Sequence, residues 1–496
     1  MIKSYVYLLL GVMMWVFYAC ESDQQDLQNL NQQPQSVSQE EPLTATKVSE
    51  EINLIIQKNG SFDWKDASDY LLWSAAMNSD NIISVGYGET SFSEEKSKVL
   101  LESKENLMKR IAANEGVTVA DVLLHDDAIL NYFDIKVSKK STIQLIRSIP
   151  DVRYVQPTGF SQSYFERSDS GCSNGPEVIA AADFTTLNTG AKVPWSYTAH
   201  NIDQAWDYST GQGVTVAVID TGVSDYQVLL GDEFNDFYPN RTIQKYGTFI
   251  DSWWFWATET DGYHDKCGHG TSASATIGAP NNTRGGVIGI AYESNIVSYR
   301  GTEDVVLNDY HEKKGVSQAL TELADRSDVR IISMSIGYMW SIGNIKDAIQ
   351  YAYSKGKLMF AAGGTSTDFT NWYGVIFPAS MSETVAVTGV KEEAVYNECD
   401  VCHVGSAIDF TYVMERANSN HQPVLGYETG ENRYFGGSSV ATASVAGIAA
   451  LVWSEYPTWN RSDVLQRLKE ASDLYPGKDS EFGYGNVDAL KAVRGY

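Results

Sequence analysis

The feature that most constrains the fold is a series of short, continuous apolar segments from residue 213 onward. Helical patterns, such as those at 316–326 and 345–353, separate these segments. Strands that are apolar on both faces must be covered on both sides, and intervening helices allow them to pair in parallel. The sequence therefore predicts an α/β domain whose parallel sheet carries helices on both faces. The predicted strands are 214–219, 329–334, 357–362 and 384–390.

The N-terminus has the features of an export signal. Lys3 precedes an apolar run, Tyr5–Tyr18, that is shorter than the about 20 apolar residues of a membrane span. Ala19 and Cys20 follow, and a small residue before Cys resembles a bacterial lipoprotein signal, whose Cys becomes the lipidated first residue. Residues 1–20 are therefore predicted to be a lipoprotein-type signal peptide with Cys20 as the membrane anchor of a cell-envelope protein. Plain secretion and an uncleaved anchor are the alternatives.

Two regions of different character lie between the signal and the predicted sheet. Up to about residue 50 the chain is rich in Gln, Ser, Glu and Asn, and residues 21–80 are expected to form a flexible tether and linker. From 81 to 160, a helical pattern is followed by strand, helix and strand patterns, with Pro150 ending the second helix. This order predicts a small α+β domain, and residues 161–496 are assigned to the larger α/β domain.

Three polar residues stand in glycine-rich motifs at the ends of predicted elements. Asp220 ends a strand in "AVIDTG", whereas His269 in "GHGT" and Ser439 in "GSSVA" precede helices of small residues. Taken singly, such residues are more often caps or structural groups. Together they match a known chemistry, because a serine hydroxyl attacks only when an imidazole accepts its proton and a carboxylate orients that imidazole.

These motifs, in this order, are similar to those of the subtilisin-like (S8) serine proteases, and they extend from about Trp195 to the C-terminus. "SMSIG" and "GYGNVDA" also match, and "FDIKVSKKSTIQLIRSIPDVRYVQP" resembles the second half of the inhibitory propeptide of this family. The resemblance implies a subtilisin-like fold and a serine endopeptidase that forms an acyl-enzyme on Ser439, with His269 shuttling the proton and Asp220 orienting the imidazole. The implied partners are peptide or protein substrates and the protein's own propeptide as an intramolecular inhibitor.

The resemblance also implies residues that bind the substrate and the oxyanion. The substrate would pair with an exposed strand edge at Ser335, Ile336 and Gly337, and the backbone N–H of Ser439 would donate to the oxyanion. The second donor of the family is an Asn, but Thr365 takes its place here, and its hydroxyl can donate one hydrogen bond.

Two more departures from the family pattern bear on activity. Ala443 stands where the family usually has Pro, which indicates subfamily drift because neither residue transfers a proton. The long interval between Asp220 and His269 contains an aromatic cluster at 253–256, interpreted either as a lid or subsite wall or as a local core. A non-catalytic surface binding protein on a degenerate protease scaffold is the alternative function.

The remaining cysteines, metals and charge limit the possible partners. Four cysteines other than Cys20 allow three disulfide pairings in an exported chain. Cys399-x-x-Cys402 also resembles a redox motif or half of a zinc motif, but no second such pair is present, and a local or structural disulfide is favoured. The net charge of −26 would repel a polyphosphate backbone, so nucleic acid is not expected. No cofactor is expected to be required. Structural calcium is compatible with the family, but no spaced loop motif is present and no metal is assigned; the acidic loop residues considered are Asp232, Asn235 and Asp236.

Overall fold

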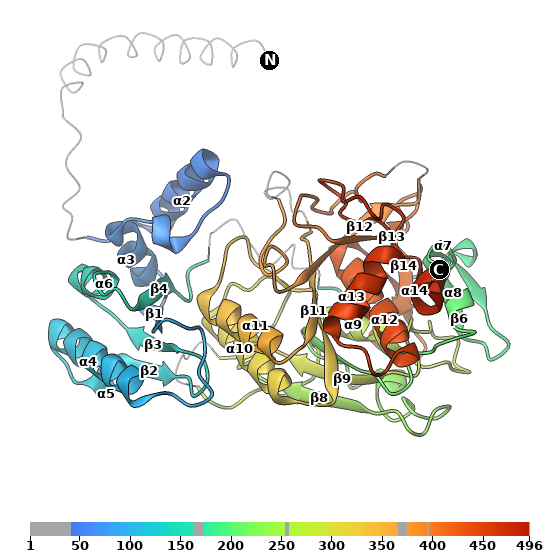
Figure 1. Cartoon of the computed structure of the whole chain (residues 1–496), viewed down its shortest axis with the longest axis horizontal. Helices are drawn as coiled ribbons and strands as arrows, with labels where there is room; N and C mark the ends of the chain where they lie inside the picture. The colour runs from blue at the N-terminus through green and yellow to red at the C-terminus, as the bar shows by residue number, and fades with distance from the viewer. Residues whose placement is uncertain (1–40, 162–171, 253–256, 366–373, 394–395, 496) are drawn as a thin grey trace, which may run out of the picture. The chain divides into compact units, whose positions relative to one another are not determined.

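A computed structural model of the chain describes residues 41–495, apart from 162–171, 253–256, 366–373 and 394–395 (Figure 1). The predicted signal peptide with Cys20 and the aromatic cluster at 253–256 therefore lie outside the described residues. The described helices and strands belong to one structural unit, Leu43–Tyr496.

A seven-stranded sheet forms the centre of the larger domain, in the order β13-β12-β11-β10-β7-β9-β8. Every neighbouring pair in this sheet is parallel, which confirms the predicted fold class. The four predicted strands match β7, β10, β11 and β12 to within a residue at each end. The bounds are β7 Thr215–Asp220, β8 Ile243–Gly247, β9 Asn295–Arg300, β10 Val329–Met334, β11 Leu358–Ala362, β12 Val385–Lys391 and β13 Phe410–Glu415.

Helices cover both faces of this sheet because its strands are apolar on both sides. On β7, Ala217 and Ile219 join the core that contains helices α10 (Tyr310–Asp325) and α11 (Gly343–Ser354). Val216 and Val218 join the opposite core, with α9 (His269–Gly278) and α12 (Gly437–Glu455). This alternation follows from the two-residue repeat of a strand. The pair α10 and α11 lies side by side in Figure 1.

Helix α12 is the central buried helix of the domain. Among the described residues it is the one helix that is long and apolar enough to cross a membrane, but 94% of its apolar window is buried inside the protein. Its small residues allow close packing: a Cβ at Gly447 would lie 2.9 Å from Cβ of Ile290. Its apolar character is therefore that of a core helix.

The N-terminal part of the described chain contains the predicted small α+β domain. Its antiparallel sheet has the order β2-β3-β1-β4. Its first helix begins at Lys98, because Ser97 caps it by accepting a hydrogen bond from the backbone N–H of Leu100. The elements are β1 Ile82–Tyr87, α4 Lys98–Glu115, α5 Val119–Val122, β2 Leu123–Asp126, β3 Tyr132–Lys136, α6 Lys140–Arg147 and β4 Val152–Pro157.

The prediction of a flexible tether and linker over 21–80 is wrong for residues 45–77. These residues form α2 (Ala45–Asn59), the 3-10 helix η1 (Trp64–Asp66) and α3 (Asp69–Met77). Ile52 and Ile56 are completely buried, and their spacing of four residues places them on one helical face. The polar composition that precedes residue 50 misled the interpretation, although this apolar spacing was present in the sequence.

Shorter elements complete the larger domain. Two antiparallel pairs, β5 with β6 and β14 with β15, flank the main sheet. The remaining bounds are η3 Ala181–Asp183, β5 Phe184–Thr186, β6 Lys192–Pro194, α7 Trp195–Ala199, α8 Ile202–Ala205, η4 Val228–Leu230, β14 Gln422–Leu425, β15 Asn432–Phe435, α13 Arg461–Glu470 and α14 Ala489–Arg494.

Candidate active site

The end of β7 and the start of α9 bring Asp220 and His269 together. Oδ1 of Asp220 lies 2.8 Å from Nδ1 of His269, and the two residues are 0% and 4% exposed. A carboxylate accepts hydrogen bonds, so Nδ1 of the imidazole carries the proton and Nε2 is the acceptor nitrogen. The sequence prediction paired these two residues, and the structure places them in contact.

Glycines permit this close approach of strand end and helix start. A Cβ at Gly270 would lie 2.4 Å from the carbonyl oxygen of Gly222. Gly222 itself has φ of +105°, and a Cβ there would lie 2.3 Å from the carbonyl oxygen of Tyr263. Larger residues at these two positions would separate the elements that carry Asp220 and His269.

Ser439 is the third residue of α12 and is 8% exposed. The first backbone N–H groups of a helix have no intrahelical partner, and the helix dipole favours negative charge near them. The chain that enters α12 lies against the imidazole, because the rings of Phe435 and His269 contact edge to face with centroids 5.0 Å apart. Helices α9 and α12 also pack against each other.

Thr365, the predicted second oxyanion donor, lies beside the start of α12. Its Oγ1 is 3.1 Å from Oγ of Ser438, and either atom can be the donor. The Ser438 hydroxyl also accepts a hydrogen bond of 3.3 Å from the backbone N–H of Gly364. A Cβ at Gly437 would lie 2.8 Å from Oγ1 of Thr365, so a glycine is needed there. Sequence reasoning missed Ser438, although "GSSVA" places it directly before Ser439.

The predicted substrate-binding edge, residues 335–337, is hydrogen-bonded to Ser439, but the backbone of residues 305–307 already pairs with part of it. The Ser335 hydroxyl donates to the carbonyl oxygen of Ser439 at 3.1 Å. The backbone N–H of Gly337 donates to the carbonyl oxygen of Val305 at 2.9 Å, and the carbonyl oxygen of Gly337 accepts from the N–H of Leu307 at 3.1 Å. A peptide can therefore pair with Gly337 only if residues 305–307 move. The structure does not expose Gly337 as the open edge that the resemblance implied.

Position 337 requires a glycine because the protein's own backbone lies close to it. A Cβ at Gly337 would lie 2.6 Å from the carbonyl oxygen of Phe377. Ile336, its neighbour, is buried. The close approach that Gly337 permits in this structure is that of the protein's own chain.

A buried carboxylate, Glu312, holds the loop that contains residues 305–307. Its Oε2 accepts hydrogen bonds of 2.9 Å from the backbone N–H groups of Asn308 and Asp309, and its Oε1 accepts one of 2.9 Å from the Thr302 hydroxyl. Burial, with Asp304 nearby, raises the pKa of Glu312 to about 8. The sequence signal for this contact is the capping box Asp309-x-x-Glu312, which had not been recognised.

The four described cysteines form two disulfides. Cys399 pairs with Cys402, which is the local one of the two kinds of disulfide that the sequence left open. Cys172 pairs with Cys267, two residues before His269, across a sequence separation of 95 residues. No group of three His, Cys, Asp or Glu side chains suited to hold a metal ion occurs among the residues that the structure describes.

The fold and these side chains define an α/β protein with Asp220, His269 and Ser439 around the carboxyl ends of a parallel sheet. The chain belongs to the subtilase family, whose sequence model, "Subtilase family", matches residues 211–485, and it is a serine endopeptidase. It is 30% identical over 322 residues to a thermostable alkaline protease of Halalkalibacterium halodurans, covering 64% of this chain and 78% of that protein. Subtilisin NAT of Bacillus subtilis subsp. natto is 29% identical over 286 residues, covering 58% and 67%.

Solved structures show the same fold at lower sequence identity. Fervidolysin from Fervidobacterium pennivorans, a keratinolytic enzyme related to subtilisin, superposes with a TM-score of 0.60 at 17% identity, covering 84% of this chain and 61% of that one. The epidermin leader peptide processing serine protease of Staphylococcus aureus gives 0.57 at 18% identity, covering 83% and 97%. The chain therefore spans less than two thirds of fervidolysin and nearly all of the epidermin-processing protease.

Proposed function

We propose that Asp220, His269 and Ser439 form the catalytic triad of this endopeptidase. The observation that carries the proposal is the buried hydrogen bond between Asp220 and Nδ1 of His269. It fixes the tautomer in which Nε2 accepts a proton, as a general base for serine requires. The placement of Ser439 at the start of a helix that packs against α9 supports its role as the nucleophile.

In the proposed reaction, Oγ of Ser439 attacks the carbonyl carbon of the scissile peptide bond while Nε2 of His269 takes the hydroxyl proton. Asp220 stabilises the resulting imidazolium, and the backbone N–H of Ser439 and the Thr365 hydroxyl donate to the oxyanion. The imidazolium then gives its proton to the leaving amine, which leaves an acyl-enzyme on Ser439. Water, deprotonated by His269, hydrolyses this ester and restores the serine.

We propose that residues 335–337 bind the peptide substrate through the backbone. The hydrogen bond between Ser335 and Ser439 supports this role, because it places the segment next to the nucleophile. Binding at Gly337 requires the displacement of residues 305–307, whose backbone occupies its donor and acceptor. The substrate would then take over these two hydrogen bonds.

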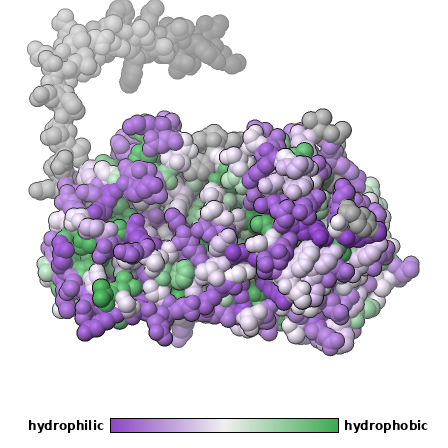
Figure 2. Space-filling view, in the orientation of Figure 1, coloured by the Kyte–Doolittle hydropathy of each residue, from purple (hydrophilic) through white to green (hydrophobic). Residues whose placement is uncertain are grey.

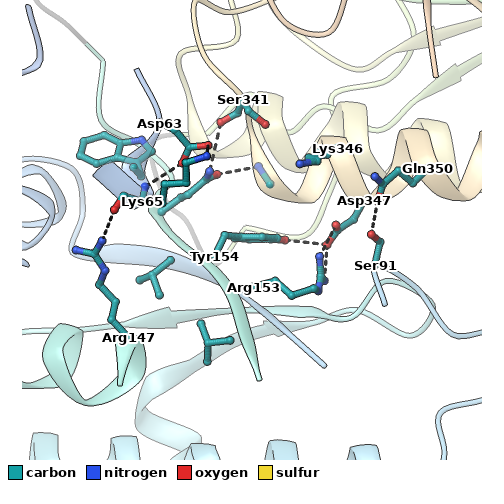
Figure 3. A pocket seen from close by; sticks show the side chains of 15 residues that line it. Asp63, Lys65, Ser91, Arg147, Arg153, Tyr154, Ser341, Lys346, Asp347 and Gln350 are labelled. Carbon is teal, nitrogen blue, oxygen red and sulfur yellow. Dashed lines mark hydrogen bonds and ion pairs between the residues drawn. The ribbon is translucent and has the colours of Figure 1, made fainter. Parts of the chain in front are cut away.

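The N-terminal domain is proposed to be the intramolecular inhibitor. Arg153 of β4 forms hydrogen bonds of 2.7 and 2.8 Å with the two carboxylate oxygens of Asp347 on α11, and the Tyr154 hydroxyl donates to the same carboxylate at 3.1 Å. Figure 3 shows these three side chains converging, together with the contact between Ser91 and Gln350. They line a cavity of about 400 Å³ between the domain and α11.

The segment that follows β4 contacts the loop beside the substrate edge. The buried Lys313 ammonium donates to the carbonyl oxygens of Thr158 and Asn308, and burial lowers its pKa to about 8. The Ser161 hydroxyl donates to the side chain of Asn308 at 3.1 Å. These contacts support a role of the N-terminal domain in holding residues 305–307 against Gly337.

We further propose that the protein is exported and tethered to the membrane by lipid on Cys20. The support for the lipid anchor is the sequence: a short apolar run, then Ala19 and Cys20, then polar residues. The two disulfides of the described chain are in keeping with an oxidising compartment.

Substitution of the nucleophile tests the catalytic proposal. Ser439→Ala should abolish labelling by a fluorophosphonate probe and lower peptide hydrolysis to the residual level of about 10³–10⁴ over water that binding and the oxyanion site supply. Ser444→Ala, a buried serine on the same helix, is the matched control and should keep both activities. Wild-type rates of hydrolysis by Ser439→Ala would disprove the triad. A wild-type chain that has been cleaved from its N-terminal domain and still shows no labelling would favour the non-catalytic binding protein.

A further inference from the structure

A second buried carboxylate lies between the elements that carry the proposed triad residues. Asp265 is 0% exposed and precedes α9 by a few residues. Its Oδ1 accepts hydrogen bonds from the backbone N–H groups of Cys267 and Gly268 at 2.9 and 2.8 Å. Its Oδ2 accepts from the N–H and the hydroxyl of Thr271 at 2.9 and 2.6 Å. Asp265 therefore holds the first turn of the helix that begins at His269.

The same carboxylate reaches the turn that follows β7. The Thr221 hydroxyl donates to Oδ1 of Asp265 at 2.9 Å and accepts from the backbone N–H of Gly270 at 2.8 Å. The backbone N–H of Thr221 donates to Oδ1 of Asp220 at 2.8 Å, the oxygen that also faces His269. These hydrogen bonds join Asp265, through Thr221, to the Asp220 carboxylate and to the backbone of Gly270, the residue after His269.

The location explains why a carboxylate is used. Gly268, the N-cap residue of α9, has no side chain to accept from the first N–H groups of the helix. An anion in front of these groups also interacts favourably with the helix dipole. Burial raises the pKa of Asp265, and the hydrogen bonds from Thr271, Gly268 and Thr221 oppose that shift. The Asp265 carboxylate substitutes for the missing cap.

We propose that Asp265 is a positioning residue for the peptidase reaction: it fixes the turn after β7 to the start of α9, so that Asp220 and His269 keep their mutual geometry. The proposal rests on the proposed triad. It assigns no contact with substrate to Asp265, whose effect passes through Thr221 and the helix backbone. A misplacement of about 1 Å in a catalytic group can cost about 10²-fold in rate.

The test uses the full chain with variants at both ends of this connection. Asp265→Asn should lower kcat by about 10- to 100-fold and leave KM within about twofold, because the loss concerns the reacting groups and not substrate binding. Thr221→Val, which removes the connecting hydroxyl, should lower kcat by about tenfold, whereas Thr221→Ser should keep most of it. The double variant Asp265→Asn with Thr221→Val should lose less than the product of the two single losses, because both changes break the hydrogen bond between Thr221 and Asp265.

The control is Glu415→Gln, which neutralises a fully buried carboxylate on β13, and it should keep kcat. The proposal is overturned if Thr221→Val is as active as Thr221→Ser, a comparison that stands even if Asp265→Asn fails to fold. It is also overturned if a folded Asp265→Asn has wild-type kcat or if Glu415→Gln shows the same loss. These outcomes are separate from a failed triad, which would show as hydrolysis by Ser439→Ala.

Discussion

At the residue scale, the Thr365 hydroxyl has two possible uses, and the direction of one hydrogen bond decides between them. If the Ser438 hydroxyl donates to Oγ1 of Thr365, the threonine hydrogen is available to an oxyanion at Ser439. If Thr365 donates instead, its only hydrogen is already used. The N–H of Gly364 donates to Ser438, which satisfies one acceptor site of that hydroxyl and leaves its own hydrogen for Thr365. This arrangement favours the first use.

We therefore expect Thr365→Ala to lower kcat by about tenfold to 10³-fold with little change in KM, because the lost hydrogen bond matters chiefly in the transition state. Thr365→Ser keeps the hydroxyl and is the control, and Thr365→Asn should preserve or raise kcat. Steady-state kinetics on one peptide substrate measures all three variants. A kinetically silent Thr365→Ala would mean that the second donor lies elsewhere.

The sequence identified the candidate site residues that stand in family motifs, and it missed those whose role depends on hydrogen bonds formed only in the folded protein. Asp220, His269 and Ser439 each stand in a glycine-rich motif, and the structure brings the first two into direct contact. Ser438 stands in the same motif as Ser439, Glu312 stands in a capping box, and Asp265 comes shortly before "GHGT", but these signals do not show which backbone N–H groups fold around the side chains. Gly337 is the opposite case: the motif "SMSIG" predicted an exposed strand edge there, but the backbone of residues 305–307 forms hydrogen bonds with it.

At the element scale, the contact between β4 and α11 depends on a buried charge pair. The Asp347 side chain is 2% exposed and that of Arg153 is 20% exposed, so both charges lose much of their hydration. Removing one partner of a buried pair leaves the other charge uncompensated, which typically costs about 3–5 kcal/mol. The attachment of the N-terminal domain to α11 should therefore be sensitive to either residue.

Asp347→Asn should weaken the proposed inhibition. By this estimate the domain would bind at least about 100-fold more weakly, so peptide hydrolysis by the uncut full-length chain should rise. Asp325→Asn is the matched control, because that carboxylate contacts Tyr351 and Lys355 within the larger domain. Equal hydrolysis by wild type and Asp347→Asn would argue against inhibition through this contact.

Elements were predictable where the apolar pattern was long or regular. The parallel strands were found to within a residue, because continuous apolar runs between helical patterns leave few other structures. Helices α2 and α3 were missed because average composition outweighed the spacing of a few apolar residues. Between these helices, the rings of Phe62 and Trp64 contact that of Trp340, with centroids 5.0 and 6.3 Å apart, and no local pattern shows such contacts.

At the scale of the whole molecule, the net charge and the face drawn in Figure 2 give little attraction to a membrane. The net charge is −26, which anionic lipids repel. Hydrophilic residues cover most of the face shown in Figure 2, and the apolar residues on it occur in small groups. The apolar helix α12 is buried inside the protein. The proposed membrane association should therefore depend mainly on the N-terminal segment.

The variant Cys20→Ser therefore distinguishes three possibilities for the N-terminal segment: a lipid anchor on Cys20, an uncleaved apolar anchor and plain secretion. If Cys20 carries lipid, the wild-type chain should be in the membrane fraction with acylated Cys20 as its first residue, and Cys20→Ser should move to the soluble fraction. Each buried CH₂ of an acyl chain contributes about 0.8 kcal/mol, and no electrostatic attraction compensates for its loss, so the shift should be nearly complete. Ser22→Ala, which keeps the cysteine, is the control.

A Cys20→Ser chain that stays in the membrane would indicate an uncleaved apolar anchor, and a soluble wild-type chain with an unmodified N-terminus would indicate plain secretion. Mass spectrometry of both fractions distinguishes the three, because each predicts a different first residue or a different mass.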